Sequence, residues 1–277
     1  MNFHAFIITK IDVYCILLSL LRKPWYLHSM EKVTTGPEFS IIVTHEGTIE
    51  GLHRTLDSIF GQTYDDFEVL LSSPSDTSSL SIEIDSRLTM IEGIQGNLSE
   101  ARNAGLEQAR GSFLLFIESG DEIQRMWLEK ASQRLELSQA DAVQCATVYE
   151  KDNLTSAVHM PNDSIFGFHK RLVFTNTIPL GSMIVSRSVC PRFDEALPLA
   201  GDWQFWIEAL RKRKIDILPE YYGHIVHVED VMARKQRSGY DRQHVIVMEK
   251  HVGELGVSLK RLRQQLRIRK LRQRLTL

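Results

Sequence analysis

Two carboxylates, Glu118 and Asp121, follow directly on the apolar run of residues 112–117. Carboxylates this close together on a turn can share a hard divalent cation such as Mg2+ or Mn2+ through oxygen ligands. The same position lets Asp121 cap the helix that we expect a few residues later, because a short acidic side chain accepts backbone N–H bonds at a helix start. The residues alone leave a metal site and a helix cap both open.

Polar side chains also follow an earlier apolar run. Residues 67–71 are strand-like, and the next polar residues are Ser72, Ser73, Ser75 and Asp76. In an open parallel sheet, ligands bind outside the carboxyl ends of the strands. These two polar segments are therefore the first candidates for a binding site.

The elements that must position these residues alternate between strand-like and helix-like patterns, which is typical of parallel strands joined by crossover helices. Strands are predicted at residues 39–44, 67–71, 88–91, 112–117, 142–149, 182–186 and 215–218. Helices are predicted between Thr48 and Gly61 and at residues 99–110, 126–137 and 203–213. The pattern predicts an α/β domain with a mostly parallel central sheet flanked by helices.

The composition of the 277 residues excludes several classes of protein. With 43% hydrophobic and 25% charged residues, the chain is typical of globular proteins and not of disordered ones. A formal net charge of -2 gives no reason to expect a nucleic-acid partner. Cys15, Cys145 and Cys190 lack CxxC spacing, which argues against a thiolate metal site or a disulfide scaffold and favours a cytoplasmic protein.

Residues 1–35 are interpreted as an extension that precedes the domain. Lys10 and Asp12 lie near the middle of its apolar stretch, where each charge costs about 2.5–3.5 kcal/mol in a membrane. The uninterrupted apolar run 13–21 is too short to span a bilayer. Two interpretations stay open, a helix on the membrane surface and an adventitious extension with the natural start at Met30.

Residues 236–277 are predicted to form a basic helical tail beyond a domain at residues 36–235. Between Lys260 and Leu277 there are eight basic residues and no acidic one. A basic amphipathic helix can bind an anionic membrane surface, which would place the protein at the inner face of the membrane. Docking of the tail on a partner or on a second subunit is the alternative.

An ordered series of motifs extends across the chain. It comprises residues 39–44, 56–69, 99–111 with their Arg-Asn-Ala-Gly sequence, 116–121, 181–187, 193–195, 201–206 and 219–227. Together these segments resemble the family-2 glycosyltransferases, inverting enzymes that use nucleotide-sugar donors. The resemblance covers residues 39–234 and implies a GT-A (nucleotide-diphospho-sugar transferase) fold.

The resemblance implies that Asp202 is the general base, which deprotonates the acceptor hydroxyl as it attacks the anomeric carbon. Capping of the helix at 203–213 is the alternative role for Asp202. The family resemblance also implies a divalent cation, Mg2+ or Mn2+, at the donor diphosphate. Its ligands would be Asp121, Glu118 and His227. Trp203 and Trp206 are candidates for stacking on an acceptor sugar, with core packing as the alternative.

The resemblance further implies a set of donor-binding residues: Thr44, Glu46, Ser73, Asp76, Arg102, Asn103 and Glu118. For Arg102, a structural ion pair is the alternative. The chain departs from the family in this region, because Ser72 and Ser73 stand where the family has two aspartates, one of which contacts uracil. Gly120 likewise replaces an acid of the metal turn.

The resemblance and these residues together predict an inverting, metal-dependent hexosyltransferase. It would move a sugar from a nucleotide-sugar, most simply a UDP-sugar, to a hydroxyl of a glycan or lipid-linked acceptor in cell-surface polysaccharide biosynthesis. The departures at Ser72, Ser73 and Gly120 motivate the alternative, a non-catalytic glycosyltransferase-like subunit that binds or scaffolds a glycan-assembly complex. A phosphate-binding Rossmann regulator is disfavoured, because no GxGxxG follows the first strand.

Overall fold

The computed structural model describes residues 36–73, 85–91, 96–152, 154–161, 168–227 and 240–252. The chain divides into two units, Met1–Thr35 and Gly36–Leu277, and all described residues belong to the second. The predictions for the N-terminal extension, for Asp76 and for the basic segment 253–277 fall outside the described residues. None of the helices in the described part of the chain combines the length and the apolar character needed to cross a membrane.

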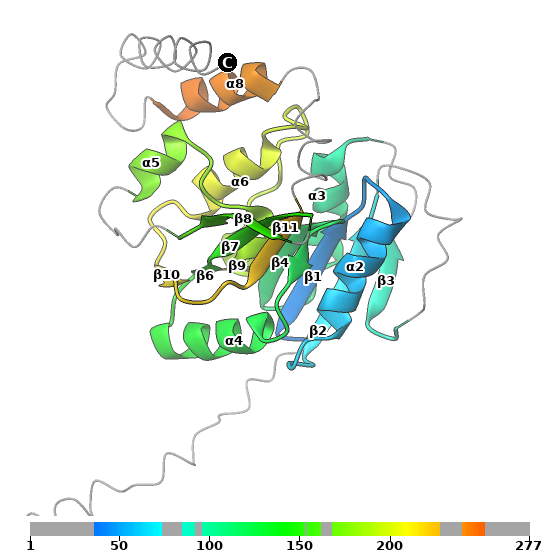
Figure 1. The fold of residues 1–277 in the computed structure, drawn as a ribbon. Helices are drawn as coiled ribbons and strands as arrows, with labels where there is room; N and C mark the ends of the chain where they lie inside the picture. Colours follow the sequence, from blue (N-terminus) through cyan, green and yellow to red (C-terminus); the bar gives the residue numbers. More distant parts are fainter. Residues whose placement is uncertain are drawn as a thin grey trace, which may run out of the picture. The chain divides into compact units, whose positions relative to one another are not determined.

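A seven-stranded sheet forms the centre of the described domain (Figure 1). Its order is β10-β6-β9-β4-β1-β2-β3, and the bounds are β1 Phe39–Thr44, β2 Phe67–Ser72, β3 Leu88–Ile91, β4 Phe113–Glu118, β6 Ala142–Cys145, β9 Met183–Ser186 and β10 Ile215–Leu218. Neighbouring strands pair in parallel except at β9, which is antiparallel to both β4 and β6. The predicted mostly parallel sheet is confirmed.

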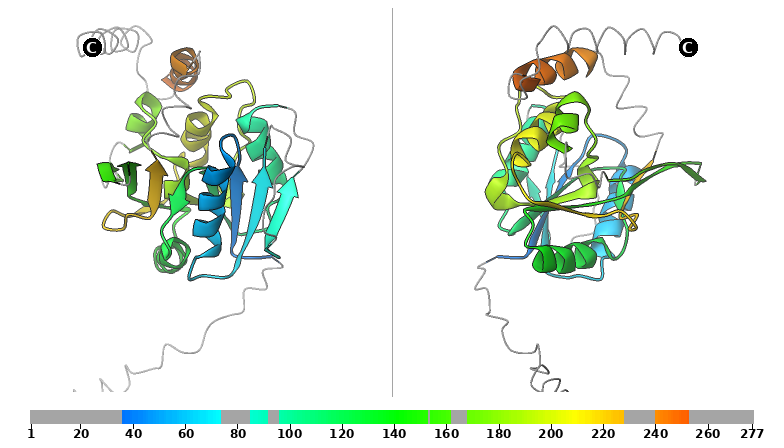
Figure 2. Two further views of the ribbon diagram at one scale, coloured as in Figure 1. Left: turned by 45° about the vertical axis from the view of Figure 1, so that its right-hand side comes forward. Right: turned by 90° about the vertical axis from the view of Figure 1, so that its left-hand side faces the viewer.

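Helices cover both faces of this sheet, because successive residues of each buried strand point to opposite faces. The helices are α2 Ile49–Phe60, α3 Leu98–Gln108, α4 Trp127–Ser138, α5 Phe168–Phe174, α6 Gly201–Ala209 and α8 Tyr240–Val252, with short 3-10 turns η1 Leu180–Ser182 and η2 Arg187–Val189. On β1, Ile41 and Val43 pack with α2 and α4. The intervening Ile42 belongs to the core beneath α5, α6 and α8, which lie on the opposite side of the sheet (Figure 2).

Helix α2 illustrates how the local sequence forms these elements. The Thr48 side chain accepts a backbone N–H bond at the start of the helix, as predicted. Leu52, Leu56 and Ile59 recur at helical spacing and are at most 3% exposed. Gly61 ends the helix. Capping and periodicity therefore agree with the tertiary packing of this helix.

A smaller sheet of four strands has the order β5-β11-β7-β8. Its strands are β5 Glu122–Ile123, β7 Thr147–Lys151, β8 Leu154–His159 and β11 His224–His227. The prediction of one strand at 142–149 is wrong, because the chain leaves the large sheet after β6 and enters the small sheet with β7. Pairing of β5 with β11 brings the segment after β4 next to the two histidines of β11.

Helix α8 lies in the stretch that we expected to form a separate tail. Its Val247 and Met248 are buried and belong to the same core as residues of α5 and α6. The side chain of Gln243 accepts a hydrogen bond of 2.8 Å from the backbone N–H of Leu199. This part of the tail is therefore packed on the domain.

Candidate functional site

The carboxyl ends of three neighbouring strands meet at one edge of the large sheet. Thr44, the last residue of β1, is in register with Ser72 of β2 on one side and with Glu118 of β4 on the other. This is the edge at which open parallel sheets bind ligands. The structure thus brings the two polar segments predicted from the sequence together.

The turn after β4 is built around Gly120. Its φ of 99° lies in a region that residues with a side chain rarely adopt, which explains why a glycine stands where the resemblance implied an acid. The backbone N–H of Gly120 donates to Thr55 Oγ1 at 2.9 Å, and this hydroxyl lies 2.7 Å from the backbone oxygen of Asp121. Helix α2 therefore fixes the backbone of the turn.

Asp121 does not cap a helix. Helix α4 begins at Trp127, and its N-cap residue is Met126. The Asp121 side chain is 6% exposed, and its Oδ2 lies 3.3 Å from Nε2 of His224. The capping alternative is therefore wrong, because β5 intervenes between the turn and the helix.

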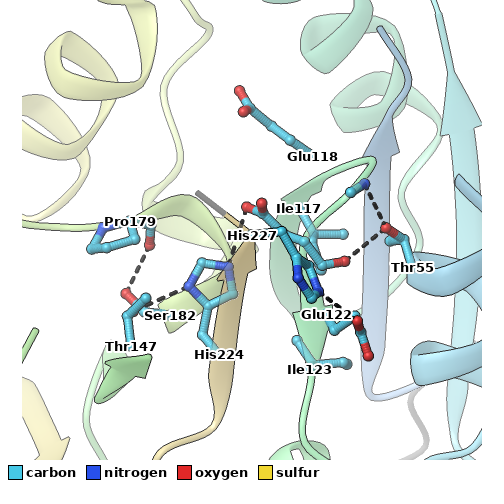
Figure 3. A network of polar contacts seen from close by, with 12 residues as sticks. Thr55, Ile117, Glu118, Glu122, Ile123, Thr147, Pro179, Ser182, His224 and His227 are labelled. Carbon is cyan, nitrogen blue, oxygen red and sulfur yellow. Dashed lines mark hydrogen bonds and ion pairs between the residues drawn. The ribbon is translucent and has the colours of Figure 1, made fainter. Parts of the chain in front are cut away.

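The two histidines of β11 have different partners. His227, the ligand implied by the resemblance, places Nε2 at 2.7 Å from Oε1 of Glu122 (Figure 3). His224 instead contacts Asp121. They diverge because successive residues of a strand point to opposite faces and the two histidines are three positions apart. Among the residues that the structure describes, no group of three or more His, Cys, Asp or Glu side chains is placed to hold a metal ion.

Glu118 forms an ion pair with Arg102 of α3. The Nη2 atom of Arg102 lies 2.5 Å from Glu118 Oε1, and the Arg102 side chain is only 4% exposed. The guanidinium carbon lies 5.4 Å from the ring centroid of Phe193, within range of a cation–π contact. No acceptor contacts Arg102 Nε within the described ranges. The ion-pair alternative for Arg102 is therefore what the structure shows.

Asp202 lies in the first turn of α6, partly buried. It is not the N-cap, which is Ala200. Asn176 Nδ2 donates to Asp202 Oδ2 at 2.8 Å. Burial raises the pKa of the Asp202 carboxyl above its ordinary value, the positive charge of Arg102 opposes this shift, and the negative charge of Glu118 adds to it. A carboxylate with a raised pKa is a better proton acceptor than an exposed one.

The remaining predicted donor residues differ in their availability. Thr44 and Ser73 are each 2% exposed, and the Ser73 hydroxyl donates to the backbone oxygen of His45 at 2.8 Å. Glu46 is exposed. Asn103 is 2% exposed. Its amide oxygen accepts a hydrogen bond of 2.8 Å from the backbone N–H of Phe193, and its amide nitrogen donates one of 3.0 Å to the backbone oxygen of Phe193. The structure therefore gives Asn103 a role in docking the segment that contains Phe193.

Trp203 and Trp206 lie in the core and not on an acceptor surface. They are 1% and 0% exposed, and the indole N–H of Trp203 donates to the backbone oxygen of Leu172. A ring that is fully covered has no face for a sugar. The core-packing alternative is therefore correct for both residues.

Asn176 and His224, the partners of Asp202 and Asp121, were not predicted from the sequence. Asn176 lies in an irregular segment before η1, where the sequence has no periodic pattern to place it. The sequence does show that His224 and His227 have different surroundings, because residues three positions apart on a strand point to opposite faces. Which of the two faces Asp121 depends on pairing with β5, a two-residue strand that no local pattern predicts.

Known proteins resemble this chain both in sequence and in fold. Residues 40–192 match the sequence model of a family described as Glycosyl transferase family 2. The chain is 29% identical over 115 residues to the uncharacterized glycosyltransferase EpsJ of Bacillus subtilis, covering 39% of this chain and 33% of EpsJ. It is 30% identical over 110 residues to the glycosyltransferase GlyA of Streptococcus pneumoniae, covering 38% of this chain and 16% of GlyA. The matches thus span a third or less of the length of these relatives.

Solved structures of S. aureus TarS 1–349 have a similar fold. The complex with UDP gives a TM-score of 0.59 at 19% identity and covers 82% of this chain and 78% of that chain. The complex with UDP-GlcNAc gives a TM-score of 0.55 at 19% identity and covers 69% of this chain and 58% of that chain. The predicted fold is confirmed by this likeness.

Proposed function

The chain belongs to glycosyl transferase family 2, and from that premise we propose that it transfers a sugar from a nucleotide-sugar donor to an acceptor hydroxyl with inversion. The observation that carries the proposal is the environment of Asp202. This carboxyl is partly buried at the carboxyl edge of the sheet, is bound by Asn176, and has a raised pKa.

The proposed reaction is a single displacement at the anomeric carbon. The acceptor oxygen forms the new C–O bond while its proton passes to Asp202. The bond between the anomeric carbon and the donor diphosphate breaks, and the nucleoside diphosphate leaves with the electron pair. One displacement inverts the configuration. The hydrogen bond from Asn176 would orient the base toward the acceptor.

We propose that a divalent cation binds at the turn, held by its carboxylates together with the diphosphate of the sugar donor. Mg2+ is commonly bound by one or two carboxylates together with substrate phosphates, and Mn2+ accepts the same oxygen ligands. Asp121 is the first ligand in our proposal. Glu118 and His227 would have to exchange their partners Arg102 and Glu122 to contribute. When bound, the cation would neutralise charge that develops on the leaving diphosphate.

The donor and the acceptor are proposed at the level of chemical class. TarS shares the fold and has been solved with UDP and with UDP-GlcNAc, so a UDP-sugar is the first donor to test. We propose a glycan or lipid-linked acceptor in cell-surface polysaccharide synthesis. The eight basic residues between Lys260 and Leu277 support binding of the protein to an anionic membrane surface.

Thermal melting tests the donor class. The protein is melted with UDP, GDP, dTDP and CDP, each with and without Mn2+, beside an Asp121→Asn variant. A ligand at about 100 times its Kd adds about 2.7 kcal/mol to the free energy of unfolding, or roughly 5–10 °C in Tm. We expect UDP with Mn2+ to stabilise the wild type and the variant to lose the effect. Stabilisation by UDP without metal dependence would contradict the assignment of Asp121.

A second candidate function, a non-catalytic binding or scaffold subunit, is favoured by the two serines at the carboxyl end of β2. The Ser72 hydroxyl donates to the backbone oxygen of Ala101, and the Ser73 hydroxyl donates to that of His45. These hydroxyls therefore serve the fold where the family has aspartates. Release of UDP from a UDP-sugar in the presence of acceptor would exclude this candidate.

A further inference from the structure

His224 is a fully buried histidine with a polar partner at each ring nitrogen. Its exposed fraction is 0%. Nε2 lies 3.3 Å from Oδ2 of Asp121. Nδ1 lies 3.1 Å from Oγ1 of Thr147, which is also 0% exposed (Figure 3). Two contacts on opposite sides of an imidazole fix the orientation of its ring.

The chemistry of the partners sets the direction of these contacts. An ionised carboxylate only accepts hydrogen bonds, so His224 Nε2 donates to Asp121. In a neutral ring Nδ1 is then the acceptor, and the Thr147 hydroxyl donates to it. The hydroxyl, the imidazole and the carboxylate thus form one directed chain that ends at Asp121.

The surrounding backbone makes room for this imidazole. A Cβ atom at Gly181 would lie 2.4 Å from Nε2 and from Cδ2 of His224, far inside contact distance. Only a glycine at this position lets the ring approach Asp121 without displacement. From the opposite side, the Thr55 hydroxyl holds the backbone oxygen of Asp121 at 2.7 Å. Asp121 is therefore clamped through both its backbone and its side chain.

We propose that His224 is a positioning residue, which fixes the orientation of the Asp121 carboxylate for the cation and the donor diphosphate. The proposal rests on the proposed function. Because His224 is fully buried, it acts through Asp121 and does not itself touch the donor. His227, whose side chain is 17% exposed and contacts Glu122, has no such contact with Asp121 in the structure.

Mn2+ binding measured by the electron paramagnetic resonance signal of free Mn2+ tests this role. The titration is done on the folded protein with saturating UDP. Removal of a partner that orients a ligand typically costs 10–100-fold in metal affinity, so we expect His224→Leu to weaken Mn2+ binding by about that factor. His224→Gln, which restores an N–H donor, should recover most of the affinity.

His251→Leu is the matched control. His251 is also buried, and its Nε2 on α8 contacts the amide oxygen of Gln204 on α6 at 2.8 Å. Its loss should lower Tm in a similar way and leave Mn2+ affinity unchanged. If the His224 variants do not fold, Thr147→Val removes only the hydroxyl that fixes the ring, and it should weaken Mn2+ binding by a smaller factor.

The outcomes separate the two claims. A wild type that binds neither UDP nor Mn2+ contradicts the proposed function itself. A wild type that binds both, beside a folded His224→Leu or Thr147→Val protein with unchanged Mn2+ affinity, overturns the role of His224 alone. Equal losses in His224→Leu and His251→Leu would show a general structural effect and also overturn it.

Discussion

Two arginine–glutamate pairs lie at opposite ends of the strands of the large sheet, which we call its amino edge and its carboxyl edge. The polar atoms of the two pairs differ in how many hydrogen bonds they form. At the amino edge, Glu68 accepts hydrogen bonds from the backbone N–H of Arg110 at 2.7 Å, from its Nε at 2.8 Å, and from the Ser40 hydroxyl at 2.7 Å. At the carboxyl edge, Arg102 contacts Glu118 through one nitrogen at 2.5 Å. The Nε atom of Arg102 has no acceptor among the described residues.

The pKa values of two carboxyls, Glu68 at the amino edge and Asp202 at the carboxyl edge, are shifted in opposite directions. Burial raises the pKa of Glu68, but the hydrogen bonds from Arg110 and Ser40 outweigh it and hold the pKa below its ordinary value. Burial raises the pKa of Asp202, and neither Arg102 nor Asn176 offsets it. The carboxyl at the amino edge is thus stabilised by its hydrogen bonds, whereas the carboxyl edge keeps an acid with a raised pKa, as functional sites commonly do.

The largest expected effect is that of Asp202→Asn. Loss of the proton acceptor should lower kcat by about 10²–10⁴-fold, the usual contribution of general base catalysis. UDP affinity should stay close to that of the wild type, because the substitution keeps the shape of the side chain. Release of UDP and calorimetric UDP titration on the same preparation measure both. An equal loss of binding and turnover would instead assign Asp202 a structural role.

Glu68→Gln tests the other edge. The variant loses the charge that Arg110 and the Ser40 hydroxyl stabilise, and we expect it to lower the free energy of unfolding by about 1–3 kcal/mol. The expected loss of unfolding free energy is modest because the Arg110 side chain is 70% exposed, so that solvent screens its charge. Urea unfolding measures the loss. The folded variant should retain the wild-type kcat, and a large fall in kcat would contradict the division between the edges.

Exchange of each arginine for glutamine sharpens the comparison. The charge of Arg102 lowers the pKa of Asp202, so Arg102→Gln should move the acid limb of the kcat/KM profile to higher pH. Arg110→Gln is the matched control and should leave that limb in place. The measurement is the pH profile of kcat/KM for both variants, recorded side by side. An acid limb that shifts in both variants would show a nonspecific effect.

The smallest effect is an opposite pH dependence of stability at the two edges. The lowered pKa of Glu68 stabilises the fold fully above its ordinary value of 4.5, and this stabilisation is lost as the pH falls through the lowered pKa. The destabilisation in Glu68→Gln should therefore shrink in acid.

For Asp202 the sign is reversed. The folded state keeps a proton that the unfolded state releases above the ordinary pKa of 3.8, so wild-type stability falls as the pH rises through the raised pKa. Asp202→Asn should gain stability relative to the wild type over that range. Thermal melting across pH checks both signs, and parallel curves for the two variants would contradict them.

Much of the fold was predictable because its elements have local causes. The apolar strand at Phe39–Thr44 and the helix between Thr48 and Gly61 formed where periodicity and capping indicated. The position of Asp202 at the start of a helix also followed from the pattern, which predicted a helix at residues 203–213. The break at Ala146 between β6 and β7 did not, because both halves of that run are equally strand-like in sequence.

The partners within the site were harder to predict. Asn176 reaches Asp202 from a segment 26 residues earlier in the chain, and His224 reaches Asp121 across 103 residues. Such contacts depend on how distant elements pair, which local patterns do not encode. The burial of Trp203 likewise depends on packing between helices, which gives the aromatic ring next to Asp202 a structural role.

The pH dependence of kcat/KM in the wild type and in Asp202→Asn tests the central claim most directly. The account predicts that wild-type activity rises with pH through the raised pKa of Asp202, because only the ionised carboxylate can take the proton from the hydroxyl of the acceptor substrate. The residual activity of the variant should lack this limb. The same acid limb in the variant would show that another group takes the proton, and it would contradict the assignment of Asp202 as the base.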